Sequence, residues 1–335
     1  MNISPLARTL LWPFSLLYGW HVHLRAWLYA HGWLSQKRLA ATVVSVGNLT
    51  VGGTGKTPMV LWLAKKFLDE GKRVAILSRG YRGADGTSDE VEVMKHRLQT
   101  RVAFGVGKNR FAEGQRIMTQ QPIDVFLLDD GFQHLQLARD LDIVLIDASR
   151  QLGHQLLLPA GTMRERLTAL DRADLVIFTR TESAAGAQEA LQKLCKFPLF
   201  AATTRLLGFK LLGGDESLHC LGAIGSEPFF AFCGIGNPEA FFSDLRDWGV
   251  PIAGHMAFAD HHRYTPAEAR SLEQVADQCG AKAFVTTEKD LYNLAEVRPQ
   301  KLPVYIAVID FVLRREDELM AAIKGTLQST RGAAA

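Results

Sequence analysis

The sequence predicts an α/β protein in which a parallel sheet with helices on both faces precedes a second, smaller α/β domain. Short runs of β-branched residues alternate with helical patterns, which is typical of parallel strands joined by helical crossovers. The chain has 335 residues, more than one typical domain. Apolar residues make up 47% of it and charged residues 22%, so it can bury a core, and disorder and fibrous structure are excluded.

Buried strands are expected throughout the chain, because apolar runs end in glycines, acids or hydroxyl residues. In the first half the expected strands are 41–46, 73–77, 123–128, 141–147 and 174–179. In the second half we expect strands at 229–232, 283–286 and 304–308, and amphipathic helices at 238–248 and 266–279.

The N-terminal segment differs from the rest of the chain. No acid precedes Asp69, and four of the six Trp residues lie in the first 33 positions. Apolar residues recur at helical spacing from Leu10 to Leu28, and the stretch between Arg8 and Arg25 carries no formal charge. This stretch is shorter than the roughly 20 residues of a spanning helix. We expect an amphipathic helix that lies on an anionic membrane surface, and a helix packed on the protein's own core is the alternative.

A glycine-rich loop follows the strand at 41–46 and precedes a helical pattern, as in phosphate-binding loops. Backbone N–H groups of such a loop turn towards phosphate, Lys56 can neutralise phosphate oxygens, and Thr57 can offer its hydroxyl to Mg²⁺. The usual pattern has Gly where this chain has Thr50. The candidate nucleotide-binding residues here are Thr50, Val51, Gly52, Gly53, Thr54, Gly55, Lys56 and Thr57.

Two further strand ends carry charged side chains. The strand at 123–128 ends in Asp129 and Asp130, which resembles the acidic element that reaches Mg²⁺ in nucleotide-binding proteins. The strand at 73–77 is followed by Arg79 and Arg82 among glycines, where anionic groups would be held. The Asn-Lys-x-Asp motif that specifies guanine does not follow the strand at 174–179, so ATP is favoured over GTP.

The motifs of the chain, taken in order, closely resemble those of the tetraacyldisaccharide 4′-kinase family. The resemblance implies an enzyme that transfers the γ-phosphoryl group of ATP, with Mg²⁺, to the 4′-hydroxyl of a tetraacylated glucosamine disaccharide 1-phosphate. The product would be lipid IVA, in lipid A biosynthesis. The matching strings, between residues 45 and 290, are SVGNLTVGGTGKTP, SRGYRG, LLDDGFQH, LARDLDIVLID, LLPAGTMRERL, FCGIGNP, FADHHRYT and TTEKD.

The resemblance also assigns roles to individual residues. Asp89 matches the catalytic base of the family, and His261 matches the histidine that pairs with it, alongside Lys56. Glu90 is the rival for the base, because the residues around Asp89 depart from the family pattern and the stretch before it is short. Metal-binding residues would be Thr57, Asp129, Asp130 and Glu165. Further nucleotide contacts would come from Arg110 and Arg164, beside Arg79 at the strand end described above.

The segment TTEKD leaves two interpretations open. It ends an expected strand, so its threonines and acids are suited to cap the helix that follows. It is also part of the family resemblance, which favours a place in the site.

Five segments are expected from these observations. They are an N-terminal amphipathic membrane-associating helix (1–38), a P-loop kinase domain (39–204), a hairpin-like linker (205–227), a C-terminal α/β domain (228–328) and a disordered tail (329–335).

The expected partners are the lipid A precursor and a membrane surface with anionic lipid, at the cytoplasmic face of the bacterial inner membrane. A net charge of +3 is too small for a dedicated nucleic-acid binder. No obligate protein partner is evident. The alternative function is a membrane-associated P-loop NTPase switch or metallochaperone, in which the acids would only order Mg²⁺.

Overall fold

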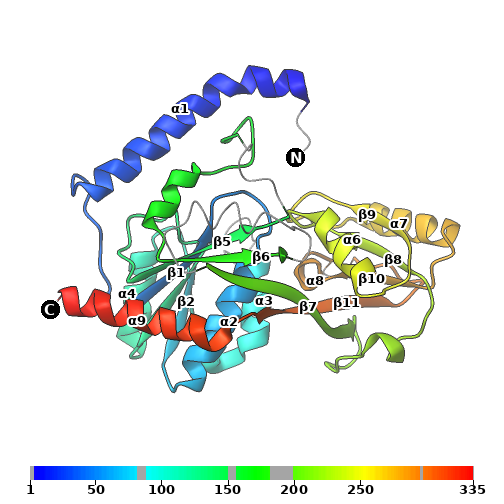
Figure 1. The fold of residues 1–335 in the computed structure, drawn as a ribbon. Helices are drawn as coiled ribbons and strands as arrows, with labels where there is room; N and C mark the ends of the chain where they lie inside the picture. Colours follow the sequence, from blue (N-terminus) through cyan, green and yellow to red (C-terminus); the bar gives the residue numbers. More distant parts are fainter. Residues whose placement is uncertain (1–3, 81–87, 150–155, 182–198, 295–296, 335) are drawn as a thin grey trace. The chain divides into compact units, whose positions relative to one another are not determined.

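The computed structural model describes residues 4–80, 88–149, 156–181, 199–294 and 297–334. Contacts divide the chain into two compact units. Unit 1 comprises 1–80, 98–203 and 312–335, and unit 2 comprises 81–97 and 204–311. Each unit is an α/β structure on parallel strands, which confirms the predicted fold class (Figure 1).

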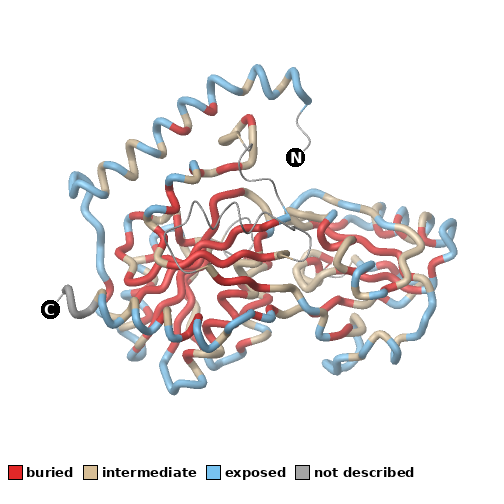
Figure 2. The backbone as a smooth tube through the Cα atoms, viewed as in Figure 1, coloured by how far each residue is buried: buried red, intermediate tan, exposed pale blue. Residues whose placement is uncertain are grey.

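Unit 1 contains the parallel sheet that the first half of the sequence predicts. Its strand order is β3-β2-β4-β1-β5-β6-β7, and the neighbouring strands are parallel. The central strands are buried on both faces because helices and loops cover the sheet (Figure 2). The strands are β1 (Thr42–Asn48), β2 (Val74–Ser78), β3 (Ala103–Val106), β4 (Val125–Asp129), β5 (Leu141–Asp147), β6 (Leu175–Thr179) and β7 (Leu199–Leu211).

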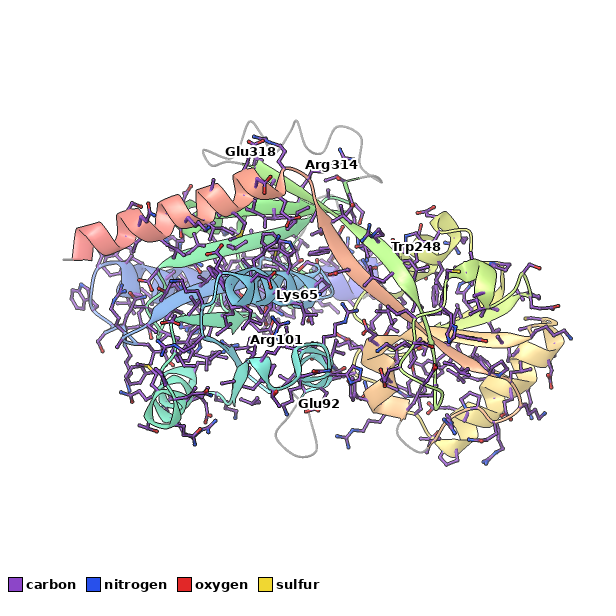
Figure 3. The ribbon with its side chains drawn as sticks, turned by 90° about the horizontal axis from the view of Figure 1, so that it is seen from below. Lys65, Glu92, Arg101, Trp248, Arg314 and Glu318 are labelled. Carbon is purple, nitrogen blue, oxygen red and sulfur yellow. The ribbon has the colours of Figure 1, made fainter. Side chains whose placement is uncertain are left out.

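The helices of unit 1 contact this sheet from several positions in the chain. Helix α2 (Lys56–Asp69) contacts the central strands, and α4 (Arg110–Gln120) contacts β2 and β3. Helix α9 (Glu316–Ala334) follows β11 and contacts β5, with Arg314 and Glu318 at the junction (Figure 3). The expected disordered tail, 329–335, is therefore helical as far as Ala334.

Helix α1 (Pro5–Ala30) turns its small residues inwards. Ser15 and Gly19 are its buried residues. The Ser15 hydroxyl lies 3.0 Å from the carbonyl oxygen of Leu157, to which it donates, and accepts from the Ala160 N–H at 3.0 Å. Much of the outward side of α1 is exposed (Figure 2). The exposed apolar side chains include Leu6, Leu10, Phe14, Leu17 and Trp20, whereas Leu24 and Leu28 of the predicted stripe are half-buried. Among the described residues, no helix is long and apolar enough to span a membrane.

Unit 2 is a smaller α/β structure with the strand order β11-β10-β8-β9, again with parallel neighbours. Aromatic side chains, among them Phe230, Phe232 and Phe284, form much of its core. Its elements are α3 (Asp89–Leu98), β8 (Phe229–Cys233), α6 (Pro238–Asp247), β9 (Ile252–Ala257), α7 (Pro266–Gln278), β10 (Ala283–Thr287), α8 (Glu288–Leu294) and β11 (Val304–Leu313).

Two long neighbouring strands, β7 and β11, each contribute residues to both units. They are antiparallel, since Arg314 N–H donates to the Ala201 carbonyl at 2.9 Å and Leu212 N–H donates to the Val304 carbonyl at 2.8 Å. The first part of the segment expected as a linker, up to Leu211, is thus regular strand.

Candidate active site

The glycine-rich loop of unit 1 connects β1 to α2 and has the backbone of a phosphate cradle. Gly52 and Gly55 have φ angles of +101° and +87°, which glycine adopts without a steric penalty. Within the described chain, no side chain caps α2 and its first turn has no acid. Its first backbone N–H groups, together with Lys56, therefore suit the phosphates of a nucleotide.

Backbone pairing holds this loop against the segment 162–164. Val51 N–H donates to the Thr162 carbonyl at 2.8 Å, and Arg164 N–H donates to the Leu49 carbonyl at 2.7 Å. Inside the loop, the Asn48 amide donates to the Thr54 hydroxyl at 2.9 Å. These bonds bring Arg164 and Glu165, which are more than 100 positions further along the chain, to the predicted nucleotide-binding loop.

Asp130 forms an ionic cluster at the end of β4. It has a φ of +51°, a conformation that is uncommon for a residue with a side chain. Its carboxylate lies 2.8 Å from Arg164 Nη1 and 3.5 Å from Lys56 Nζ. Burial by itself would raise the pKa of Asp130, but the charges of Lys56 and Arg164 hold that pKa well below its ordinary value.

Asp129 is in a different environment, although it is the preceding residue. It is buried, and its carboxylate accepts a hydrogen bond from Ser78 Oγ at 3.3 Å. Burial, followed by the charge of Asp130, raises the pKa of Asp129. A buried carboxylate with a raised pKa gains from a divalent cation, and carboxylate and hydroxyl oxygens are the donors that Mg²⁺ prefers. Asp129 and Thr57 therefore fit the predicted metal site.

The remaining predicted residues of unit 1 have other protein partners. Arg110 is buried and donates through Nη2 to the backbone carbonyl of Asp129 at 2.9 Å, so it holds the end of β4. Glu165 lies 2.8 Å from Arg172. Arg79 is exposed after β2, and Arg82 lies outside the described residues.

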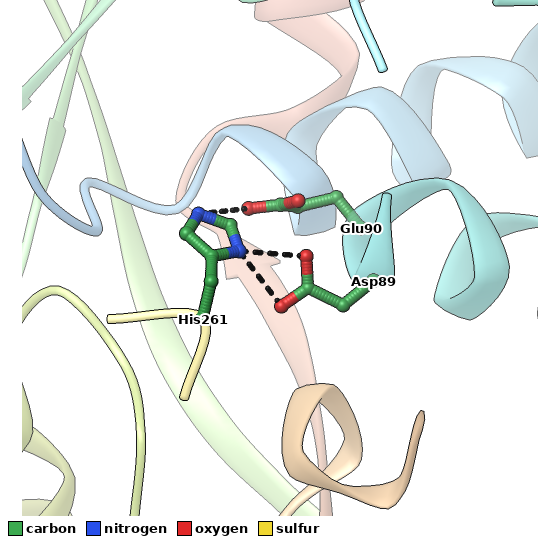
Figure 4. A group of neighbouring side chains, drawn as sticks. All are labelled: Asp89, Glu90 and His261. Atoms are coloured by element: carbon green, nitrogen blue, oxygen red, sulfur yellow. Dashed lines mark hydrogen bonds and ion pairs between the residues drawn. The ribbon is translucent and has the colours of Figure 1, made fainter. Parts of the chain in front are cut away.

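A second cluster of predicted residues lies in unit 2. Asp89 begins α3, and His261 lies in a turn after β9. The Nδ1 atom of His261 lies 2.8 and 2.9 Å from the two carboxylate oxygens of Asp89 (Figure 4). The Nε2 atom of His261 faces Glu90, at 3.7 Å. The structure thus brings Asp89, its rival Glu90 and His261 together.

The electrostatics of this cluster separate the two neighbouring acids. Burial favours the neutral form of Asp89, but the hydrogen bond from His261 and the charge of Lys289 outweigh it and lower the Asp89 pKa. Burial and the Asp89 charge raise the pKa of Glu90. The hydrogen bond to Asp89 raises the pKa of His261. Asp89 is therefore the ionised partner of His261, and Glu90 is the acid that binds a proton more readily.

The backbone of His261 is held in a left-handed conformation, with φ of +60°. Its N–H donates to the carbonyl of Gly234 at 3.1 Å, at the end of β8. Such a conformation costs free energy and persists where surrounding contacts impose it. The turn therefore aims the imidazole at α3.

The sequence indicated the segment TTEKD without separating capping from a place in the site, and in the structure its residues have both kinds of contact. The Thr287 hydroxyl accepts from the Asp290 N–H at 3.3 Å, which caps α8. Lys289 Nζ lies 2.7 Å from Glu90 Oε1, in the second cluster. Asn293, which no sequence motif indicated, donates to Asp89 Oδ2 at 3.2 Å.

Comparison with known proteins gives one family across nearly the whole chain. Residues 7–328 match the family described as Tetraacyldisaccharide-1-P 4'-kinase. The chain is 39% identical over 343 aligned positions to the tetraacyldisaccharide 4'-kinase of Geobacter metallireducens, covering 97% of this chain and 100% of that protein. It is 40% identical to the Geobacter sulfurreducens protein of the same name, covering 88% of this chain and 87% of that one.

A solved structure is similar in fold over the same extent. The structure of LpxK from Aquifex aeolicus in complex with ATP has a TM-score of 0.74 and 31% identity, and the match covers 96% of this chain and 99% of that one. Together with the geometry above, these matches establish that the chain belongs to the tetraacyldisaccharide-1-P 4'-kinase family and is a kinase of lipid A biosynthesis.

Proposed function

We propose that this protein transfers the γ-phosphoryl group of ATP to the 4′-hydroxyl of a tetraacylated glucosamine disaccharide 1-phosphate and so forms lipid IVA. The observation that carries the proposal is the pairing of Asp89 with His261 at 2.8 Å. A phosphate-binding loop fits any nucleotide hydrolase. A kinase needs a proton acceptor as well as this loop, because a sugar hydroxyl must lose its proton as it is phosphorylated. The buried carboxylate–imidazole pair supplies that acceptor.

The residues of unit 1 are proposed to bind ATP and Mg²⁺. The glycine loop and the first turn of α2 bind the phosphates. The ammonium group of Lys56 offsets negative charge on the phosphoryl group to be transferred. Thr57 and Asp129 would hold Mg²⁺, with Asp130 and Glu165 behind them. When bound, the ion neutralises charge on the β- and γ-phosphate oxygens. Arg164 keeps Asp130 ionised and oriented.

The residues of unit 2 are proposed to activate the 4′-hydroxyl group that accepts the phosphoryl group. Asp89 and His261 act as one proton-accepting pair, in which the imidazole fixes the orientation of the carboxylate and shares the proton taken from the 4′-hydroxyl. The lowered pKa of Asp89 keeps a charged acceptor available at neutral pH. Glu90 is the weaker candidate because it lies 3.7 Å from His261 Nε2, beyond hydrogen-bond distance, while its Oε1 atom is held by Lys289 Nζ at 2.7 Å.

The outward face of α1 suits peripheral binding at the cytoplasmic face of the inner membrane. Leu10, Phe14, Leu17 and Trp20 are all exposed, and a surface helix with aromatic and aliphatic residues on one face inserts into the bilayer interface. A cavity of about 270 Å³ lies between α1 and the loop that follows Leu157, and Arg164 lines it. A lipid acceptor taken up at α1 would thus meet a residue of the nucleotide-side cluster within the same unit.

A coupled assay tests the function directly. Purified full-length protein is mixed with ATP, Mg²⁺ and the tetraacylated disaccharide 1-phosphate in detergent micelles, and the lipid product and ADP are both measured. We expect a bisphosphorylated lipid in a one-to-one ratio with ADP. Equal ATP turnover with and without the lipid, and no phosphorylated lipid, would instead indicate a nucleotide hydrolase.

The variant Asp89→Asn tests the proton-accepting pair. It keeps the shape of the side chain but removes the charge, so turnover should fall by about 10²–10⁴-fold while ATP binding is retained. Asp215→Asn, at an exposed acid of the same unit, is the matched control and should keep normal turnover. Near-normal turnover of Asp89→Asn would show that another acid accepts the proton, and Glu90→Gln would then be the next variant.

A further inference from the structure

Helix α8 presents two side chains to Asp89 from the same face. Lys289 and Asn293 are four residues apart and therefore lie one above the other on the helix. Asn293 Nδ2 donates to Asp89 Oδ2 at 3.2 Å and also to the carbonyl of Lys289 at 3.4 Å. Lys289 Nζ lies 3.7 Å from the same Asp89 oxygen. Both contacts fall on the oxygen of Asp89 that also faces His261 Nδ1 at 2.9 Å.

Lys289 is the shared counter-ion of three carboxylates. Its Nζ lies 2.7 Å from Glu90 Oε1, 3.3 Å from Asp260 Oδ1 and 3.7 Å from Asp89 Oδ2. Only a fifth of its side chain is exposed, so these attractions are weakly screened. The contacts come from α3 and from Asp260, in the turn that carries His261, so one ammonium group links the two segments that carry the proton-accepting pair.

A metal ion is a rival explanation for this cluster. Asp89, Glu90 and His261 offer ligand atoms within 4.8 Å of one another. The ammonium group of Lys289, however, already contacts both of these acids and supplies the positive charge that they require. The cluster is thus balanced by a residue of the chain.

A plain structural ion pair is the second rival explanation. Arg97 and Glu288 form one nearby, where the guanidinium also donates to the Ile309 carbonyl at 2.7 Å. That pair does not contact Asp89. Lys289 and Asn293 both do, and Asn293 carries no charge to be neutralised. Its amide therefore serves to orient the carboxylate.

We propose that Lys289 and Asn293 are positioning residues for phosphoryl transfer, through which α8 fixes the orientation and the charge of the Asp89–His261 pair. The proposal rests on the proton-accepting role proposed above for that pair. Neither residue is assigned to substrate, nucleotide or metal. They act through Asp89.

The positive charge of Lys289 determines the pH range in which the Asp89–His261 pair is free to accept a proton. The ammonium group of Lys289 lowers the pKa of Asp89 and also that of His261. Glu90 and Asp260, the acids that face the pair, remain when Lys289 is removed. Loss of the positive charge raises the pKa of both partners, so the proton-free form needed for catalysis is reached only at higher pH. This direction is the same whichever partner receives the proton.

The experiment compares Lys289→Met with Lys289→Arg in the full-length protein. Methionine keeps the chain length without the charge, and arginine keeps the charge. The measured quantity is kcat/KM for the lipid between pH 5.5 and 9.5. For Lys289→Met we expect the acid limb of kcat/KM at higher pH. Each unit of displacement should lower kcat/KM by up to about tenfold at pH 6, and this loss should shrink towards pH 9. Lys289→Arg should keep the limb of the parent protein.

Controls separate this effect from damage to the fold. Lys282→Met, at an exposed lysine of the same unit, should leave the pH profile unchanged. If Lys289→Met fails to fold, Asn293→Leu replaces it, because it removes a donor to Asp89 without changing the charge. Asn293→Leu should lower kcat, move the acid limb in the same direction and leave KM for ATP unchanged.

The outcomes distinguish the two proposals. An equal loss at every pH, or a parent-like profile, in Lys289→Met would overturn the positioning role. If Asp89→Asn and His261→Gln both keep normal turnover, the proton-accepting pair itself is wrong. If they lose turnover while Lys289→Met behaves as the parent, the pair stands and only the role of α8 is lost.

Discussion

The carboxylate of Asp290 accepts a hydrogen bond from the backbone N–H of Gly234 at 2.8 Å. The carbonyl of the same glycine accepts from the N–H of His261 at 3.1 Å. Asp290 also accepts from the hydroxyl of Tyr264 at 2.8 Å and from that of Thr287 at 2.6 Å. A single buried acid therefore links the start of α8 to the strand end that holds the turn of His261.

Asp290→Ala should destabilise the protein and reduce turnover together. The change leaves buried donors of Gly234, Tyr264 and Thr287 without their acceptor, and each such group costs about 1–3 kcal/mol. We expect a lower urea midpoint of unfolding and a lower kcat. Asp290→Asn keeps an oxygen acceptor and should lose less of both. Equal stability of the parent and the alanine variant would show that the network contributes nothing.

Lys56→Ala should abolish tight nucleotide binding. The ammonium group lies at the start of α2, 3.5 Å from Asp130, where the glycine loop turns its backbone towards a phosphate. We expect the ATP dissociation constant, measured by calorimetry with Mg²⁺, to rise by at least tenfold, about 1.4 kcal/mol. Lys72→Ala, at an exposed lysine of the same unit, is the control. Unchanged affinity in Lys56→Ala would place the nucleotide elsewhere.

His134 should make the protein less stable in mild acid. Burial and four arginine charges lower its pKa to about 4 from 6.5. The unfolded chain therefore binds a proton between pH 6.5 and 4 that the folded chain does not, and stability rises with pH across this window. The arginines are Arg110, Arg139, Arg25 and Arg79.

The matching variant is His134→Gln, which cannot titrate in this window. Its midpoint of urea unfolding should fall less than that of the parent protein between pH 7 and pH 4.5. Parallel curves for the two proteins would mean that another group causes the acid sensitivity.

Substituting the outward residues of α1 should separate membrane binding from folding. Leu10, Leu17 and Trp20 are 67%, 64% and 66% exposed, so their replacement by serine removes few contacts within the protein. We expect the triple variant to lose most of its sedimentation with anionic vesicles while its free energy of unfolding stays within about 0.5 kcal/mol of that of the parent. Ser15→Ala, on the buried face, should instead lower the free energy of unfolding and leave sedimentation with vesicles unchanged. Retained vesicle binding in the triple variant would exclude this face as the membrane contact.

Most strands of both units could be predicted from the sequence because they are largely buried and have continuous apolar runs. The run 141–147, for example, is the whole of β5. Strands β3 and β9, whose residues are mostly half-buried, were not predicted. Strand β7 was not predicted, since its residues alternate between buried and partly exposed as it passes from one unit to the other. Helix α3 was also missed: its short charged sequence, DEVEVMKHRL, has no clear apolar period.

The candidate site could be predicted where residues share a motif and not where they meet through the fold. Lys56 and Thr57 are recognisable from neighbouring glycines. Asn293 is not, because its contact with Asp89 spans 204 positions and depends on the register of α8. The sequence left the function of TTEKD undecided for a similar reason: adjacent residues of that segment, Lys289 and Asp290, have different partners.

The two faces of α1 are subject to different constraints. On the buried face, a Cβ atom added at Gly19 would come within 2.6 Å of Leu157, so this side tolerates little change. On the opposite side, Leu10, Leu17 and Trp20 are each about two-thirds exposed, so few contacts restrict their side chains. The bilayer affinity proposed for this helix would thus change, when one large apolar residue is exchanged for another, with little change in the stability of the protein.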